Sequence, residues 1–524
     1  MGVAMRRPYQ GQGDNRDLRG PPEPDDGTNQ SRNALWATRS ERRAQEAFVR
    51  FGVHDVPEPP PRDRKVFAVL SLLGLVLLVA AVSAYVGMTF MPSWLAAMKD
   101  TPAEASAVEV PPSAPTRPRA AAPQLAAVQS IVPAAPSVAV AAVQARSPGP
   151  AVQGVTDTEI RFGMAAPFAG PAKEMGRQLK LGIETAFAAA NDHGGVDGRQ
   201  LKLVTADDGY EPTRTLNAMK ELYEKDQVFG FIDNYGSPTA LISIPYALEH
   251  RALYFGAFTG ANSLRHDPPD RYVFNFRAGY AEEADAIVRY LVKVRRLRPE
   301  EIAVLTQQDA YGEAGMDGVT KAMRALRNGN ASPILRMTYN RNTVNVDDAV
   351  ALLRRQKFPI KAVVLVATFR PAAKFIEKTR DAYPEMVYAT ISGVGSTGLA
   401  DELKLLGPRF VDGVIVTQVV PAVDSYASVS LVYKRALANY FPGEAPDYVS
   451  LESYLTANVL IEGLRRVGPQ LDTETLVDRL ESLHDFDMGL GPRVSFGPAE
   501  HQAVHKVWGT QLDNSGQYHA IDLE

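Results

Sequence analysis

The sequence predicts an α/β protein with two lobes, each built on a parallel, doubly wound sheet. From about Val152 onward, short apolar runs alternate with amphipathic stretches at the spacing of β–α–β units. These runs form two groups, each about the size of one domain. One long apolar run at 66–91 precedes both groups and predicts a single transmembrane helix.

The N-terminal part predicts a tail, an anchor and a spacer. Residues 1–65 are polar with few aromatic residues, which predicts a mostly disordered cytoplasmic tail. Basic residues cluster just before the apolar run, which favours export of everything after it. The long leader and long apolar run favour an uncleaved signal anchor, with cleavage after Ala107 as the alternative. Residues 92–152 are rich in Ala and Pro, which predicts an extended linker.

The elements of the body follow in order. The first group has expected strands at 160–167, 201–208, 228–233 and 252–258, and expected helices at 174–192, 213–225 and 238–250. The second group has expected strands at 301–307, 334–340, 361–367, 386–392 and 413–420, separated by helices. A long helix at 450–468 and short C-terminal strands complete the chain. Several crossings between the lobes predict a hinge with a cleft.

Composition and motifs give no positive signal for catalysis. The formal net charge of −4 does not indicate nucleic-acid binding, and the absence of Cys excludes a thiol nucleophile. GVGSTG (393–398) lacks the acidic residue that a dinucleotide site needs, and fits better as a ligand-facing loop. HQAVH (501–505) has Gln where a zinc protease has its Glu, so these histidines are better explained as surface or turn residues. We therefore expect no enzyme, cofactor or metal.

The turn GAFTGA (256–261) predicts a binding loop. Small residues follow an apolar strand here, and Thr259 brings one hydroxyl group. In open parallel sheets, ligands lie beyond the carboxyl ends of the strands. A ligand would therefore meet the backbone and the Thr259 hydroxyl, and the alternative is an ordinary tight loop.

Four segments in succession carry a family resemblance: GMAAPFAGPAKEMGRQLKLGIETAFAAANDHGGVDGRQLKLVTADDGYEP, ALYFGAFTGANSL, TQQDAYGEAGMDGV and GVIVTQVVP. Through them the body at 153–524 resembles the type I periplasmic binding proteins of the leucine/isoleucine/valine receptor family. The resemblance implies a two-lobed fold, with lobe 1 at about 153–277 and 420–495. Lobe 2 is then 278–419 plus the C-terminal strands.

The resemblance also implies a ligand held between the lobes. The residues that match the family's ligand contacts are Tyr235, Gly236, Ser237, Ala257, Phe258, Thr259, Tyr311, Phe369 and Ser392, with Met175 near the entrance. Four of them are aromatic, which suits a flat or less polar ligand. The alternative is that these rings pack within their own lobes.

At two positions this sequence departs from the family's pattern in a way that bears on the identity of the ligand. Amino-acid receptors of this family place a carboxylate near Ser392 for the ligand's ammonium group and a serine near Gly236 for its carboxylate. Neither stands at the matching position, which weakens an amino-acid ligand. Glu452 or Asp309 would be the substitutes for the missing carboxylate.

The predicted function is that of a membrane-tethered periplasmic solute-binding protein. It would capture an amino acid, an amide or an aromatic acid and deliver it to an ABC-type permease in the inner membrane. The alternative is a ligand sensor or assembly subunit that signals to a neighbouring membrane protein. Both place the N-terminus in the cytoplasm, the body in the periplasm and one helix across the membrane.

Overall fold

A computed structural model describes residues 152–327, 329 and 333–524. The predicted tail, the predicted anchor and nearly all of the linker lie outside the described residues. Among the residues that are described, no helix combines the length and the apolar character needed to cross a bilayer.

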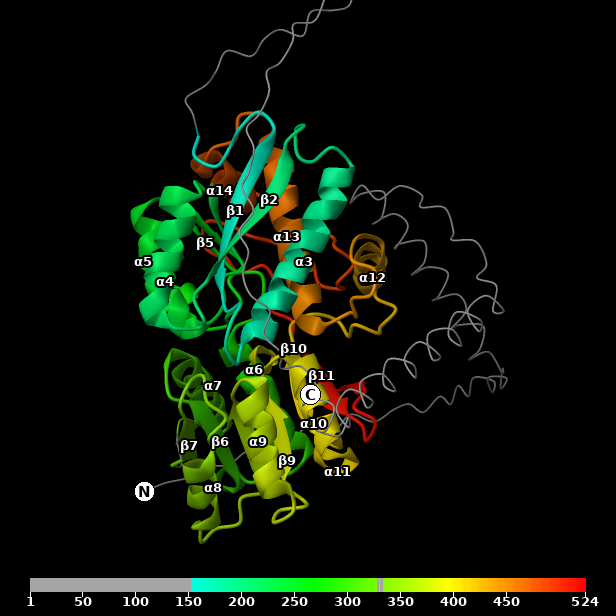
Figure 1. The fold of residues 1–524 in the computed structure, drawn as a ribbon. Helices are drawn as coiled ribbons and strands as arrows, with labels where there is room; N and C mark the ends of the chain where they lie inside the picture. Colours follow the sequence, from blue (N-terminus) through cyan, green and yellow to red (C-terminus); the bar gives the residue numbers. More distant parts are fainter. Residues whose placement is uncertain (1–151, 328, 330–332) are drawn as a thin grey trace, which may run out of the picture. The chain divides into compact units, whose positions relative to one another are not determined.

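The first sheet has five parallel strands in the order β2-β1-β3-β4-β5. The strands are β1 (Glu159–Ala166), β2 (Gln200–Asp207), β3 (Gly230–Ile232), β4 (Leu253–Phe255) and β5 (Val273–Phe274). The helices between them are α3 (Lys173–Asp192), α4 (Pro212–Lys220) and α5 (Ser237–Glu249). Because the strand order reverses beside β1, helices cover both faces, with α4 and α5 on one side and α3 on the other (Figure 1).

The second sheet has seven strands in the order β12-β11-β10-β9-β8-β6-β7. The parallel strands are β6 (Ile302–Gln307), β7 (Leu335–Tyr339), β8 (Ala362–Val366), β9 (Val387–Thr390) and β10 (Ile415–Gln418). The antiparallel edge is formed by β11 (Trp508–Leu512) and β12 (Tyr518–Ile521). Every residue of β6 and β8 is buried, as expected for central strands that helices cover on both faces.

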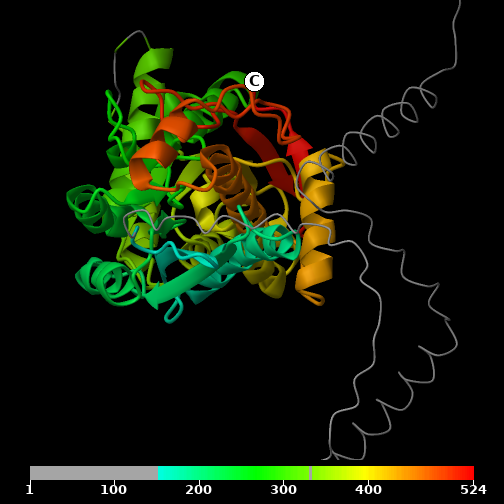
Figure 2. The ribbon, with the colours of Figure 1, turned by 90° about the horizontal axis from the view of Figure 1, so that it is seen from above.

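Helices surround the second sheet and complete the first. Those of the second sheet are α6 (Tyr280–Arg289), α7 (Ala310–Leu326), α8 (Asp347–Arg354), α9 (Phe369–Arg380), α10 (Ser396–Leu406) and α11 (Pro408–Val411). The late helices are α12 (Ser428–Tyr440), α13 (Tyr448–Val467) and α14 (Thr473–Glu481). Figure 1 and Figure 2 show α13, in orange, lying along α3 of the first sheet. A Cβ on Gly182 of α3 would lie 2.2 Å from the carbonyl oxygen of Ser450, so glycine permits this close packing.

Within the part of the chain that the structure describes, the backbone passes between the two sheets three times. The passages lie between β5 and α6, between β10 and α12, and between His501 and β11. The first and third run side by side: Asn275 N donates to His501 O at 2.7 Å, and Ala503 N donates to Asn275 O at 2.8 Å. The predicted α/β fold with two doubly wound sheets is therefore confirmed. The exact residues at which one lobe passes into the other stay a prediction.

Candidate functional site

The loops after β3 and β4 form the floor of the candidate site. The two segments stay paired beyond the strands, because Phe258 N donates to Asn234 O at 2.9 Å and Gly236 N donates to Phe258 O at 3.3 Å. The rings of Tyr235 and Phe258 stack with their centroids 6.0 Å apart. The floor is thus a short extension of the sheet that carries two aromatic rings.

Two hydroxyl groups meet on this floor. The oxygens Ser237 Oγ and Thr259 Oγ1 lie 2.7 Å apart, and both side chains are buried. Thr259 Oγ1 also accepts a hydrogen bond from Ala261 N at 3.2 Å. Ser237 is the first residue of α5, and a helix N-terminus carries a partial positive charge. This end of the floor therefore suits an oxygen of a carboxylate or a carbonyl group.

Next to the floor lies a small cavity of about 190 Å³, here called the inner cavity. Both sheets contribute to its lining, which comprises Tyr210, Tyr235, Gly236, Ser237, Phe258, Tyr280, Tyr311 and Gly393. Most of these side chains are aromatic, and the tyrosines combine an apolar ring with a polar tip. A flat or apolar group beside the paired hydroxyls would therefore lie against aromatic rings.

A second cavity of about 290 Å³, here called the outer cavity, also lies between residues of the two sheets. Its lining comprises Pro171, Ala172, Tyr210, Asn342, Thr343, Val344, Thr368, Phe369, Arg370 and Pro371. Phe369, which the sequence placed with the other predicted aromatic residues, lies here and does not line the inner cavity. The structure thus separates it from Tyr235, Phe258 and Tyr311.

Five predicted ligand residues line the inner cavity and the others lie elsewhere. Those in the lining are Tyr235, Gly236, Ser237, Phe258 and Tyr311. Ala257 and Thr259 belong to the buried floor, and Ser392 directly precedes Gly393 in the chain. Met175 is buried against Gly395, where a Cβ would lie 2.6 Å from the Met175 sulfur. Their roles toward a ligand stay predictions.

A buried charge cluster lies behind Phe258. The Arg277 guanidinium lies 4.6 Å from the centroid of the Phe258 ring and is 1% exposed. Its Nη2 lies 3.4 Å from Glu283 Oε1, and its Nη1 lies 3.5 Å from Glu452 Oε1. Nη2 also donates to Ser392 Oγ. The cluster joins α6 and the β9 loop of the second sheet to α13 beside the first sheet.

The cluster and the floor together correct both expectations about missing ligand groups. The carboxylate of Glu283 accepts hydrogen bonds from Ser392 N at 2.7 Å and from Thr417 Oγ1 at 2.6 Å, so a carboxylate does lie beside Ser392. Ser237 follows Gly236 directly and brings its hydroxyl to Thr259. Matching of sequence positions did not reveal this carboxylate, because Glu283 belongs to α6 and lies more than a hundred residues away from Ser392 in the chain.

Burial sets the protonation of these carboxyl groups. Desolvation raises the pKa of Glu452 to about 7, against the opposing effect of the Arg277 charge. Desolvation also raises the pKa of Glu283, and Arg277 and the hydrogen bond from Thr417 oppose it. Glu452 therefore changes charge near neutral pH.

The two proposed substitutes for a ligand-binding carboxylate are engaged elsewhere. Asp309 caps α7 by accepting from Tyr311 N at 3.0 Å and pairs with Arg341 at 3.0 Å. Glu452 faces Arg277, as described above. Neither carboxylate belongs to the lining of the inner cavity.

The small residues of the GAFTGA turn have a use that the sequence did not show. A Cβ on Gly260 would lie 2.5 Å from Tyr280 Cδ1, and Tyr280 N donates to Gly260 O at 2.7 Å. Gly256 has a φ of 65°, and a Cβ there would lie 2.1 Å from Thr456 Cγ2. These glycines admit side chains of the protein itself, from α6 and α13.

The structure shows where the motifs GVGSTG (393–398) and HQAVH (501–505) lie. GVGSTG forms a 3-10 turn (Ser392–Val394), a left-handed Gly395 and the start of α10, and its Gly393 lines the inner cavity. HQAVH forms the third passage between the sheets, where the buried His501 ring stacks on Phe274 with centroids 3.9 Å apart. Within the described ranges, no group of three or more His, Cys, Asp or Glu residues could hold a metal ion.

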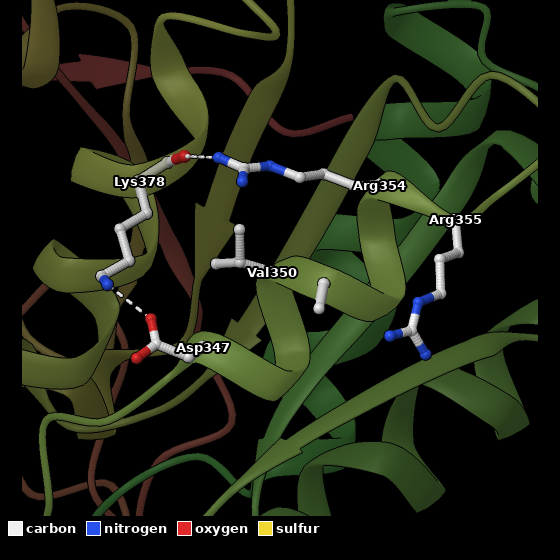
Figure 3. A pocket seen from close by; sticks show the side chains of 6 residues that line it. Asp347, Val350, Arg354, Arg355 and Lys378 are labelled. Carbon is white, nitrogen blue, oxygen red and sulfur yellow. Dashed lines mark hydrogen bonds and ion pairs between the residues drawn. The ribbon is translucent and has the colours of Figure 1, made fainter.

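A wider hollow of about 860 Å³ lies at the surface beside α8 (Figure 3). It is lined by Asp347, Val350, Ala351, Arg354, Arg355 and Lys378. Lys378 forms an ion pair with Asp347, and Arg354 Nη2 donates to the Lys378 carbonyl oxygen at 3.3 Å (Figure 3). None of the strand-end residues described above contributes to it, so we do not assign the site here.

Besides Glu283, the sequence analysis missed three residues of the site. Tyr210 follows β2, Tyr280 begins α6, and Arg277 lies in the first passage between the sheets. The position of Tyr210 at the carboxyl end of a strand was a signal that could have found it. Tyr280 and Arg277 carry no such signal, because their place depends on how the two sheets meet.

A comparison with family models matches residues 159–517 to the periplasmic binding protein family. The chain belongs to this family. The predicted resemblance is thereby confirmed, and the family consists of binding proteins rather than enzymes, as predicted. The body is a solute-binding protein of the Leu/Ile/Val-binding type.

Individual relatives agree with this assignment. The Leu/Ile/Val-binding protein BraC3 of Rhizobium johnstonii is 25% identical over 343 residues, covering 65% of this chain and 88% of the relative. A solved structure of a possible leucine/isoleucine/valine-binding protein from Rhodopirellula baltica is 34% identical, with a TM-score of 0.66 and coverage of 72% and 99%. A substrate-binding periplasmic protein from Ralstonia solanacearum is 27% identical, with a TM-score of 0.63 and coverage of 69% and 100%.

Proposed function

We propose that this chain captures a small organic solute between its two lobes and delivers it to an ABC-type permease. The solute is an amino acid, an amide or an aromatic acid. Residues 66–91 would tether the protein to the inner membrane, with the body in the periplasm. The inner cavity carries this proposal, because its lining comes from both sheets and its floor holds the paired hydroxyls of Ser237 and Thr259.

The arrangement supports one orientation of the solute. An oxygen of its carboxylate or amide would accept from one hydroxyl of the Ser237–Thr259 pair, near the start of α5. Its apolar part would then lie against the rings of Tyr235, Phe258 and Tyr311. An ammonium group on the solute would have to compete with Arg277 for Glu283, which favours an amide or an aromatic acid.

A thermal unfolding screen of the full-length protein tests the function. L-leucine, benzamide and benzoate represent the three solute classes, and a bound solute at 100 times its dissociation constant stabilises the fold by about 2.7 kcal/mol. Thr259→Val removes one hydroxyl of the pair and should weaken affinity by about 1–3 kcal/mol. Ser263→Ala, in the neighbouring turn outside both cavities, is the matched control. Equal affinity of Thr259→Val and the parent would contradict the proposed site.

The tether is tested separately. A reporter that is active only in the periplasm, fused after Glu524, should be active if the basic residues before 66–91 hold the N-terminus inside. Activity of a cytoplasm-only reporter at the same position would contradict this topology. It would leave the solute-binding assignment of the body intact.

A further inference from the structure

Tyr210 stands between the two cavities of the cleft. Among the described residues that line either cavity, it alone borders both. Its side chain is 2% exposed, and its hydroxyl accepts a hydrogen bond from Gln307 Nε2 at 2.9 Å. Because Gln307 ends β6 of the second sheet, this bond fixes the Tyr210 ring across the cleft.

The backbone around Tyr210 determines where the ring points. Its φ is 60°, a left-handed conformation that bulky residues rarely adopt. Its N–H donates to Asp208 Oδ1 at 2.9 Å, a local bond that stabilises the turn. Gly236 lies opposite, where a Cβ would be 2.3 Å from Tyr210 Cε2. The turn and the glycine together create the space that the ring fills.

The two cavities differ in chemistry. The inner cavity lies beside the hydroxyl pair of Ser237 and Thr259. The outer cavity has an apolar wall that includes Val344 and Phe369, and Val344 is 45% exposed, so this cavity faces solvent. A solute with a polar head and an apolar tail would match this order, with its head inside and its tail outside.

We propose that Tyr210 is the gate that sets the size of the solute. With the ring in place, the inner cavity is confined to the space for a small group. Turning the ring aside breaks the bond to Gln307, joins the cavities and admits a solute with a longer apolar tail. The inference rests on the proposed function, since size selection matters only if the cleft binds a solute.

The reactivity of a single introduced thiol tests whether Tyr210 acts as a gate, and the experiment needs no solute. The chain has no Cys, so an introduced Cys is the sole thiol of the full-length protein. Ser237→Cys places it in the inner cavity, and Val344→Cys places it in the outer cavity as the matched control. Each variant reacts with methyl and with benzyl methanethiosulfonate, which form a disulfide and release methanesulfinate. Mass spectrometry gives the benzyl-to-methyl rate ratio at each position.

The ratio at position 237 should be roughly tenfold lower than at position 344, the factor expected when one buried hydrogen bond must break. Tyr210→Ala should raise the ratio at 237 to that at 344 and leave the ratio at 344 unchanged. Tyr210→Phe keeps the ring but loses the bond to Gln307, and should give an intermediate ratio. This second variant decides the matter even if Tyr210→Ala does not fold.

Two results would overturn the inference: equal ratios at 237 and 344 in the parent background, or a ratio at 237 that neither Tyr210 variant changes. Either would mean that solutes reach the inner cavity without passing Tyr210. Because no solute is used, a failed binding screen and a failed gate are separate outcomes. If the ratio depends on reagent size but no solute binds, the proposed function is contradicted and the role of Tyr210 as a gate is supported.

Discussion

Replacing Arg277 by Met should destabilise the protein far more than replacing an exposed arginine. Arg277 is 1% exposed and lies 3.4 Å from Glu283 and 3.5 Å from Glu452, both of them buried. Removing one partner of a buried ion pair costs about 3–5 kcal/mol, because the remaining charge keeps no counter-ion in a low-dielectric site. Arg277→Met should therefore lower the free energy of unfolding by about 3 kcal/mol or more.

Urea unfolding of the full-length protein measures this cost against a matched control. Arg409 pairs with Asp381 at 3.1 Å, but these side chains are 67% and 63% exposed, so Arg409→Met should cost less than about 1 kcal/mol. Adding Glu283→Gln to Arg277→Met should restore part of the loss, because a neutral amide needs no counter-ion. Equal unfolding midpoints for Arg277→Met and Arg409→Met would refute the reasoning.

Burial raises the pKa of Glu452 from 4.5 to about 7, so the stability that its protonation contributes is complete below pH 4.5 and is lost as the pH rises to about 7. Glu452→Gln should lack this loss in unfolding curves measured at each pH. Gly260→Ala should cost about 1–3 kcal/mol, because its Cβ would meet Tyr280, whereas Gly497→Ala, with no atom closer than 4.0 Å, should cost little in the same assay. Small-angle scattering should show a smaller radius of gyration when solute is bound, and an unchanged profile at saturation would indicate a rigid scaffold.

The strands of the fold could be predicted because central parallel strands are continuous apolar runs. AVVLV at Ala362–Val366 is buried at every position and is β8 of the structure. The ends of strands were harder to predict where an apolar run continues past the last residue that pairs within the sheet. The expected strand at 252–258 ends at Phe255, and its last residues instead form the floor beside Tyr235. Composition cannot separate a paired residue from one that has left the sheet.

Most of the site on the first sheet could be predicted, together with Tyr311 of the second, but Tyr210 and Tyr280 were missed. Tyr235, Ser237 and Phe258 follow the carboxyl ends of adjacent strands, so topology alone brings them together. Tyr280 enters the inner cavity because Gly260 leaves space for its ring, which is a contact between a loop of one sheet and the first helix of the other. Such a contact depends on tertiary packing, and no periodicity in the sequence encodes it.

Contacts outside the inner-cavity lining also hold the two sheets together. Arg341, after β7, pairs with Glu211, before α4, at 2.8 Å, and Asn342 Nδ2 donates to Glu211 Oε1 at 2.6 Å. These bonds link the two sheets, and the Arg341 guanidinium also lies 5.7 Å from the centroid of the Tyr210 ring, which lines the inner cavity. The apparent affinity of a solute falls with the fraction of protein in the binding-competent state. Under the proposed function, bonds at Glu211 would strengthen solute binding by raising that fraction, and the solute would not have to supply the whole free energy of closure.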